Sequence, residues 1–132
     1  MDVAVIIPVF NKSRHVERAI TSALSQTLTP VEIVIVEDAS TDGSAEKIAA
    51  IKHPLVRIIH RQTPGPGGYA ARNAAIQSVG TEWVAFLDAD DSWQPNHLQS
   101  VSDAISQAGN DASIGCVFTC FYRSYEDGRS CL

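Results

Sequence analysis

Three carboxylates crowd the end of one apolar run. The run "VAFLDADDSW" covers residues 84–93 and places Asp88, Asp90 and Asp91 within four positions. Such carboxylates repel one another and lose hydration near a protein interior, so a cation is the expected partner. If the strand persists, Asp88 and Asp90 project to one side, and their hard oxygens suit Mg²⁺ or Mn²⁺ together with substrate phosphates. The plainer alternative has Asp88 and Asp91 capping a turn and Asp90 solvated, but the position after "WVAFL" favours the metal.

A second acidic pair, Glu37 and Asp38, ends the apolar run of "EIVIVEDASTDGS". An ionised carboxylate offers only acceptors, so it can bind a nucleobase imide or a ribose hydroxyl. Equally, Asp38 caps the following turn and Glu37 is exposed. Phe10 and Asn11 end the first apolar run and are candidates for a stacking face and an amide beside a base, although an aromatic there is more often core.

Positive charge comes from the stretch "GGYAARN". Gly67 and Gly68 allow close backbone approach, and the start of the helix that follows favours an anion. Arg72 falls in the first helical turn, where the helix dipole disfavours a cation unless an anion is near. Its partner is a diphosphate or, in the structural alternative, one of the aspartates.

Apolar, β-rich runs alternate with helical patterns along the chain. The predicted strands are residues 3–9, 31–36, 56–60, 83–87 and 114–122. The predicted helices are residues 16–24 with a cap at Ser13, 45–49, 70–76 and 98–108 with a start near Pro95. Strands that are apolar at nearly every position are covered on both faces, which predicts a three-layer α/β fold with a mostly parallel sheet. Ligands of such sheets bind outside the carboxyl ends of the strands, where these polar motifs lie.

Composition narrows the class of protein. The 132 residues carry 10 Lys+Arg against 15 Asp+Glu, a formal net charge of −5, which disfavours nucleic acid and anionic lipid as partners. The chain is 45% apolar, but no run approaches the ~20 residues of a membrane span, so a soluble, cytoplasmic protein is expected. Cys116, Cys120 and Cys131 lack zinc-like spacing and are expected to be buried, reduced thiols.

The ordered set "VIIPVFNK", "SALSQT", "EIVIVEDASTDGS", "AARNAAI" and "WVAFLDADDSWQPNHL" resembles the inverting family 2 glycosyltransferases of GT-A fold. The resemblance covers roughly residues 3–98. It implies that Asp90 binds Mn²⁺ or Mg²⁺ on a donor diphosphate, and that Asp88 contacts the ribose or the water shell of the metal. Asp38 would read the base. The nucleotide-binding set is then Pro8, Phe10, Asn11, Asp38, Arg72 and Asp88.

The resemblance also implies an activity. A sugar would pass from a nucleotide-diphosphate donor, with a UDP-sugar favoured, to a hydroxyl of a glycan or lipid-linked acceptor with inversion, as in cell-envelope polysaccharide biosynthesis. Residues 1–132 are expected to form one GT-A domain that ends before its acceptor-binding part and its catalytic base, in the cytoplasm or at the inner face of the membrane. The rival hypotheses are a nucleotide-binding module without turnover and a phosphoacceptor receiver domain.

Overall fold

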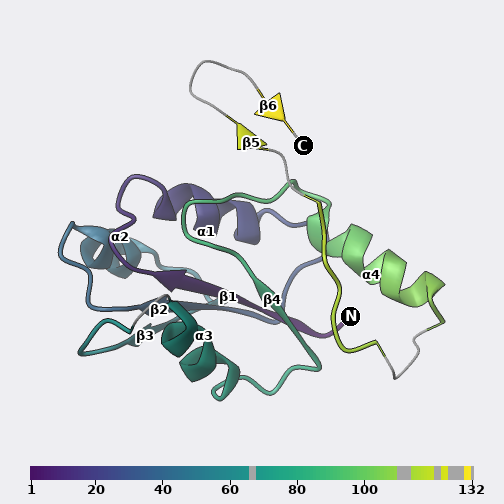
Figure 1. Cartoon of the computed structure of the whole chain (residues 1–132), viewed down its shortest axis with the longest axis horizontal. Coiled ribbons are helices and arrows are strands. Elements are labelled where there is room, and N and C mark those ends of the chain that lie inside the picture. Colours follow the sequence, from purple (N-terminus) through teal and green to yellow (C-terminus); the bar gives the residue numbers. More distant parts are fainter. Residues whose placement is uncertain (66–67, 110–113, 121–122, 125–129, 132) are drawn as a thin grey trace. The chain divides into compact units, whose positions relative to one another are not determined.

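The computed structural model describes residues 1–65, 68–109, 114–120, 123–124 and 130–131. The chain divides into two compact units, residues 1–99 and residues 100–132. Figure 1 shows the elements of both. The polar motifs at the strand ends all belong to the first unit, whose architecture therefore positions the site.

The first unit is built on a four-stranded parallel sheet in the order β3-β2-β1-β4. Its strands are β1 (Val3–Val9), β2 (Glu32–Glu37), β3 (Val56–His60) and β4 (Trp83–Phe86). The central strands β1 and β2 are buried along nearly their whole length, as expected for strands covered on both faces. In this register Val9 pairs with Glu37 and Glu37 with His60, so the carboxyl ends of three strands lie at one edge.

Helices cover both faces of this sheet (Figure 1). They are α1 (Val16–Leu24), α2 (Ser44–Ala50) and α3 (Tyr69–Ile76), and a fourth helix, α4, runs His97–Gln107. On one face, alternate β1 and β2 residues such as Ile7 pack with Ile20 of α1 and Ile48 of α2. On the other face, Ile6 packs with Ala71 and Ala75 of α3. The predicted three-layer α/β fold with a parallel sheet is confirmed.

The fifth predicted strand, residues 114–122, is wrong over the part that the structure describes. Residues 114–120 form no strand, and residues 121–122 lie outside the described part. Two-residue strands β5 (Arg123–Ser124) and β6 (Ser130–Cys131) pair antiparallel instead. Phe118 in this segment is 91% exposed. Apolar composition alone does not make a strand, because a strand also needs neighbouring strands and a covering layer to bury its side chains.

Two smaller expectations also need correction. Cys116 and Cys120 are free thiols, as predicted, but they are exposed rather than buried; the side chain of Cys131 lies outside the described part. Ser13 does not cap α1, since the N-cap is His15 and makes no side-chain cap hydrogen bond. The N–H of Ser13 is instead bound by the carboxylate of Asp42. Within the described ranges, no helix has both the length and the apolar character needed to cross a membrane.

Candidate functional site

A cavity of about 400 Å³ opens at the carboxyl ends of β1, β2 and β4. Six of the seven site residues predicted from sequence line it, and the exception is Asn11. The lining consists of Pro8, Val9, Phe10, Lys12, Asp38, Gly65, Gly68, Ala71, Arg72, Asp88, Ala89 and Asp90. The carboxyl-end rule for parallel sheets therefore located the cavity correctly.

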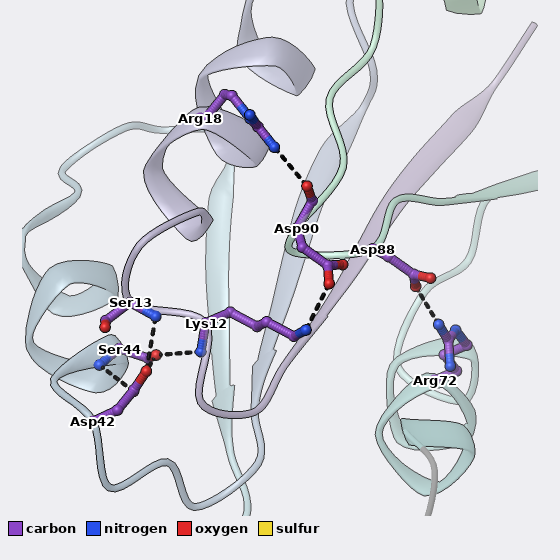
Figure 2. Close-up of polar contacts among 8 residues, drawn as sticks. All are labelled: Lys12, Ser13, Arg18, Asp42, Ser44, Arg72, Asp88 and Asp90. Carbon is purple, nitrogen blue, oxygen red and sulfur yellow. Dashed lines mark hydrogen bonds and ion pairs between the residues drawn. The ribbon is translucent and has the colours of Figure 1, made fainter. Parts of the chain in front are cut away.

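The two aspartates of the Asp88-Ala89-Asp90 motif each have a cationic partner. Asp88 forms an ion pair with Arg72 of α3, and Asp90 Oδ2 lies 2.6 Å from Lys12 Nζ. Figure 2 shows the two carboxylates turned toward these separate partners. Because β4 ends at Phe86, strand alternation does not orient the pair as predicted; a turn, with the Asp91 N–H donating to the Asp88 carbonyl at 2.9 Å, does so instead.

The charges of this turn remain only partly compensated. The hydrogen bond from Lys12 holds the pKa of Asp90 below its usual value, despite partial burial. Burial, followed by the neighbouring charges of Asp90 and Asp88, raises the pKa of Asp91. The repulsion that the sequence predicted is therefore present, and a further positive charge would be favourable here.

The residues of the turn fit a divalent cation that is shared with a substrate. Asp88 and Asp90 supply hard carboxylate oxygens, and the ammonium group on Asp90 shows that this carboxylate accepts a cation. Within the described ranges, no three His, Cys, Asp or Glu side chains are grouped to hold a metal ion. An ion at this turn would therefore need ligands from water or phosphate in addition to the two carboxylates.

Asp38 is a buried carboxylate in the cavity wall, with a relative exposure of 2%. It accepts hydrogen bonds from Arg61 and from the N–H of Gly65, the latter at 3.0 Å. Glu37, its neighbour, is buried rather than exposed, so that alternative is wrong; it accepts the Ser40 N–H at 2.6 Å and lies 3.8 Å from His60 Nδ1. Glu37 thus holds the turn, and Asp38 faces the cavity.

Lys12 and Arg61 are the site residues that the sequence analysis missed. Arg61 directly follows the end of β3, in "IIHRQ", and Lys12 lies three residues after the end of β1, in "PVFNK". A cation at the carboxyl end of a parallel strand, in a chain that places acids at the neighbouring ends, is the signal that would have identified both.

Two glycines of the loop between β3 and α3, Gly65 and Gly68, line the cavity, whereas Gly67 lies outside the described residues. Gly68 has φ +72 and lies at the N-cap of α3, where a Cβ would be 3.1 Å from Arg72 Nη1. At Gly65 a Cβ would lie 2.6 Å from the Ala70 Cβ and 2.9 Å from Arg61 Nη1. Only a residue without a side chain fits there.

Gly65→Ala is therefore expected to lower the free energy of unfolding by about 1–3 kcal/mol, the usual cost of overpacking. The matched control is Gly80→Ala, because a Cβ at Gly80 meets nothing within 4 Å. Urea denaturation of both variants measures the difference. Equal stability of the two variants would show that the loop does not pack as described.

The loop after β1 is held by the loop that precedes α2 and by Ser44, the first residue of α2; Figure 2 shows the contacts of Lys12 and Ser13. Three successive N–H groups donate to side chains: Asn11 to Ser40 Oγ at 3.1 Å, Lys12 to Ser44 Oγ at 2.9 Å, and Ser13 to Asp42 Oδ2 at 2.9 Å. Asn11 has φ +51, and its Oδ1 accepts the Thr41 N–H at 2.8 Å. Asn11 therefore holds the loop and does not line the cavity.

Asp42 should make stability depend on acidity. The Ser44 hydroxyl, together with the N–H groups of Ser13 and Ser44, holds the pKa of Asp42 far below its ordinary value of 3.8. A group whose folded pKa is lowered contributes stability that is complete above the unfolded pKa and is lost as the pH falls through the folded one. In Asp42→Asn the unfolding temperature should be lower than in the parent at neutral pH, and this difference should shrink below about pH 3.8. A difference that is constant with pH would contradict the prediction.

Comparison with known proteins places the chain in a family. The family model "Glycosyl transferase family 2" matches residues 4–131. The succinoglycan biosynthesis protein ExoO of Rhizobium meliloti (strain 1021) is 38% identical over 114 residues, which are 86% of this chain and 32% of ExoO. Chondroitin synthase of Escherichia coli is 33% identical over 119 residues, or 89% of this chain and 17% of the synthase. The chain thus spans a third or less of the length of these curated relatives.

Solved structures give the same result for the fold. TarS 1-349 of S. aureus in complex with UDP-GlcNAc has a TM-score of 0.70 and 27% identity, covering 81% of this chain and 32% of that one. The mannosyltransferase PcManGT from Pyrobaculum calidifontis, in complex with GDP-Man and Mn²⁺, has a TM-score of 0.73 and 27% identity, covering 89% of this chain and 35% of that one. With nearly its whole length matched by the family model, this chain belongs to glycosyl transferase family 2 and has the GT-A fold.

Proposed function

We propose that the cavity binds the nucleotide-diphosphate part of a sugar donor together with Mn²⁺ or Mg²⁺, within a glycosyltransferase that transfers the sugar to an acceptor hydroxyl with inversion. The observation that carries the proposal is the lining of one cavity by a buried acid, Asp38, an acidic pair, Asp88 and Asp90, and two cations. This combination suits a nucleotide. Asp38 offers acceptors to the base, the acidic pair can hold a metal, and the two cations, Lys12 and Arg72, bring positive charge to the phosphates.

The base would lie against β1 and β2. Two of the lone-pair sites of Asp38 are used by Arg61 and Gly65, which leaves capacity to accept an imide hydrogen. Phe10 is 46% exposed in the cavity wall, so it offers a stacking face and is not a core residue. Pro8 lines the same wall. A uracil base, and hence a UDP-sugar, is favoured, in line with the UDP-GlcNAc that TarS holds.

The diphosphate would lie between α3 and the turn after β4. Asp90, with Asp88, would hold the metal, and Arg72 already lies at this wall with its guanidinium on Asp88. When bound, the divalent cation supplies Lewis-acid stabilisation of the charge that develops on the departing diphosphate. Inversion requires a separate base that takes the proton of the acceptor hydroxyl on the opposite side of the sugar.

The relatives support an acceptor class, and the strand order argues against one rival, the receiver domain. ExoO is a succinoglycan biosynthesis protein, and chondroitin synthase is another relative, so a glycan or a lipid-linked sugar is the proposed acceptor. A receiver domain has the flavodoxin-like order 2-1-3-4-5. The observed order β3-β2-β1-β4 differs from it. A module that binds nucleotide without turnover would use the same cavity.

A thermal-shift panel tests the nucleotide proposal. UDP, GDP and ADP are each added with Mn²⁺ in excess. UDP at 100 times its dissociation constant should stabilise the fold by about 2.7 kcal/mol, and ADP by clearly less at the same concentration. An unfolding temperature that no nucleotide changes would contradict the proposal.

A further inference from the structure

Lys12 places a cation on Asp90, the carboxylate that is proposed to hold the metal. Its Nζ lies 2.6 Å from Asp90 Oδ2, and the side chains are 38% and 45% exposed. An ion pair so accessible to water contributes little to stability, because solvent screens it. A divalent cation can therefore replace the ammonium group at small cost.

The backbone on both sides of this pair is held independently of it. The loop that carries Lys12 is fixed by the hydrogen bonds to Ser40, Asp42 and Ser44. On the other side, Arg18 Nη2 of α1 donates to the Asp90 carbonyl oxygen at 2.6 Å (Figure 2). Breaking the ion pair would thus release only the Lys12 side chain and would leave both loops in place.

The balance of charge in the cavity indicates where the Lys12 ammonium group would lie after a metal replaced it on Asp90. In the ligand-free chain each carboxylate of the cavity wall has one cationic partner: Asp38 has Arg61, Asp88 has Arg72 and Asp90 has Lys12. A divalent cation adds two positive charges, and the diphosphate of a nucleotide sugar adds one negative charge on each phosphoryl group. The liganded cavity stays neutral only if Lys12 remains in it, now beside phosphate oxygens.

We propose that Lys12 is a diphosphate-binding residue that acts by exchange: the metal takes its place on Asp90, and the freed ammonium group pairs with the phosphates. This inference rests on the proposed nucleotide function. It gives Lys12 opposite effects on two affinities. Lys12 competes with the metal when no nucleotide is present, and it supports the nucleotide once the metal is bound.

Lys12→Met separates the two effects, because it removes the charge and keeps the length of the side chain. Mn²⁺ alone, followed by the electron paramagnetic resonance signal of the free ion, should bind about two- to fivefold more tightly, as expected from the loss of a weak competing ion pair. UDP titrated calorimetrically in excess Mn²⁺ should bind about five- to tenfold more weakly. Lys12→Arg, which keeps the charge, should retain UDP affinity within about threefold.

The matched control is Lys47→Met. Lys47 makes a similar exposed ion pair, with its Nζ 2.7 Å from Glu17 Oε2, and it does not line the cavity. Both constants should be unchanged in this variant. If both constants weaken in Lys12→Met while its unfolding temperature falls, the pair is structural and the inference is overturned. Unchanged constants in Lys12→Met, with metal-dependent UDP binding by the parent, overturn the inference alone, whereas absence of that binding in the parent overturns the proposed function as well.

Discussion

Asp90→Asn is expected to remove most of the gain in UDP affinity that Mn²⁺ brings. Two carboxylates alone cannot enclose the ion, so Mn²⁺ should bind weakly by itself and tightly with the diphosphate as an additional ligand. Couplings of this kind amount to about 5–150-fold. The asparagine keeps the shape of the side chain and an acceptor for Lys12 but removes the charge, so the gain should fall to about threefold or less.

Asp91→Asn is the matched control for Asp90→Asn. It removes a carboxylate one position further along the same turn, and Asp91 does not line the cavity. Calorimetric titration of UDP with and without Mn²⁺ should show the parent gain retained in Asp91→Asn. If the gain survives in Asp90→Asn, or is lost equally in both variants, the metal does not bind at Asp90.

Asp38→Ala should have the second largest effect, and on two properties. It removes the acceptor of Arg61 and of the Gly65 N–H. Leaving a partner of a buried ion pair alone costs 3–5 kcal/mol, and about 3 kcal/mol is expected here because Arg61 is 24% exposed. If Asp38 also accepts the uracil imide hydrogen, UDP binding should weaken by about 1.5–3 kcal/mol.

The double variant Asp38→Ala/Arg61→Ala separates these two losses. No unpaired cation remains in it, so part of the stability should return, whereas UDP affinity should stay low. Denaturation in urea and calorimetry measure the two quantities. UDP affinity that recovers with stability, or equal affinity of the parent for UDP and ADP, would show that Asp38 does not read the base.

The sheet could be predicted because its strands are apolar at nearly every position. Residues 3–9 and 56–60 form strands with the predicted bounds, and the helix predicted at residues 70–76 is present and packs on the sheet through Ala71 and Ala75. The run at residues 114–122 has the same apolar character, but residues 114–120 form no strand. Composition records a preference for burial, whereas a strand also needs neighbours, which no local pattern specifies.

The candidate site was predictable as a set of acids, but of its ion pairs the sequence analysis anticipated only that of Arg72 with an aspartate, which is Asp88. The polar runs at the strand ends identified Asp38, Asp88 and Asp90, because parallel strands bring their carboxyl ends together. The partners Lys12 and Arg61 are 78 and 23 residues distant from Asp90 and Asp38. Such pairing depends on strand order and loop path, which the sequence does not display.

Paramagnetic broadening by Mn²⁺ in ¹⁵N-resolved NMR spectra tests the central claim most directly, because it locates the metal in the presence of nucleotide. With UDP bound, a trace of Mn²⁺ should broaden first the amide signals of Asp88, Ala89 and Asp90, and EDTA should restore them. The amide signals of Asp42 and Ser44 at the neighbouring loop should broaden less. Broadening centred on Asp42, or no UDP-dependent broadening near Asp90, would contradict a metal-assisted nucleotide site in this cavity.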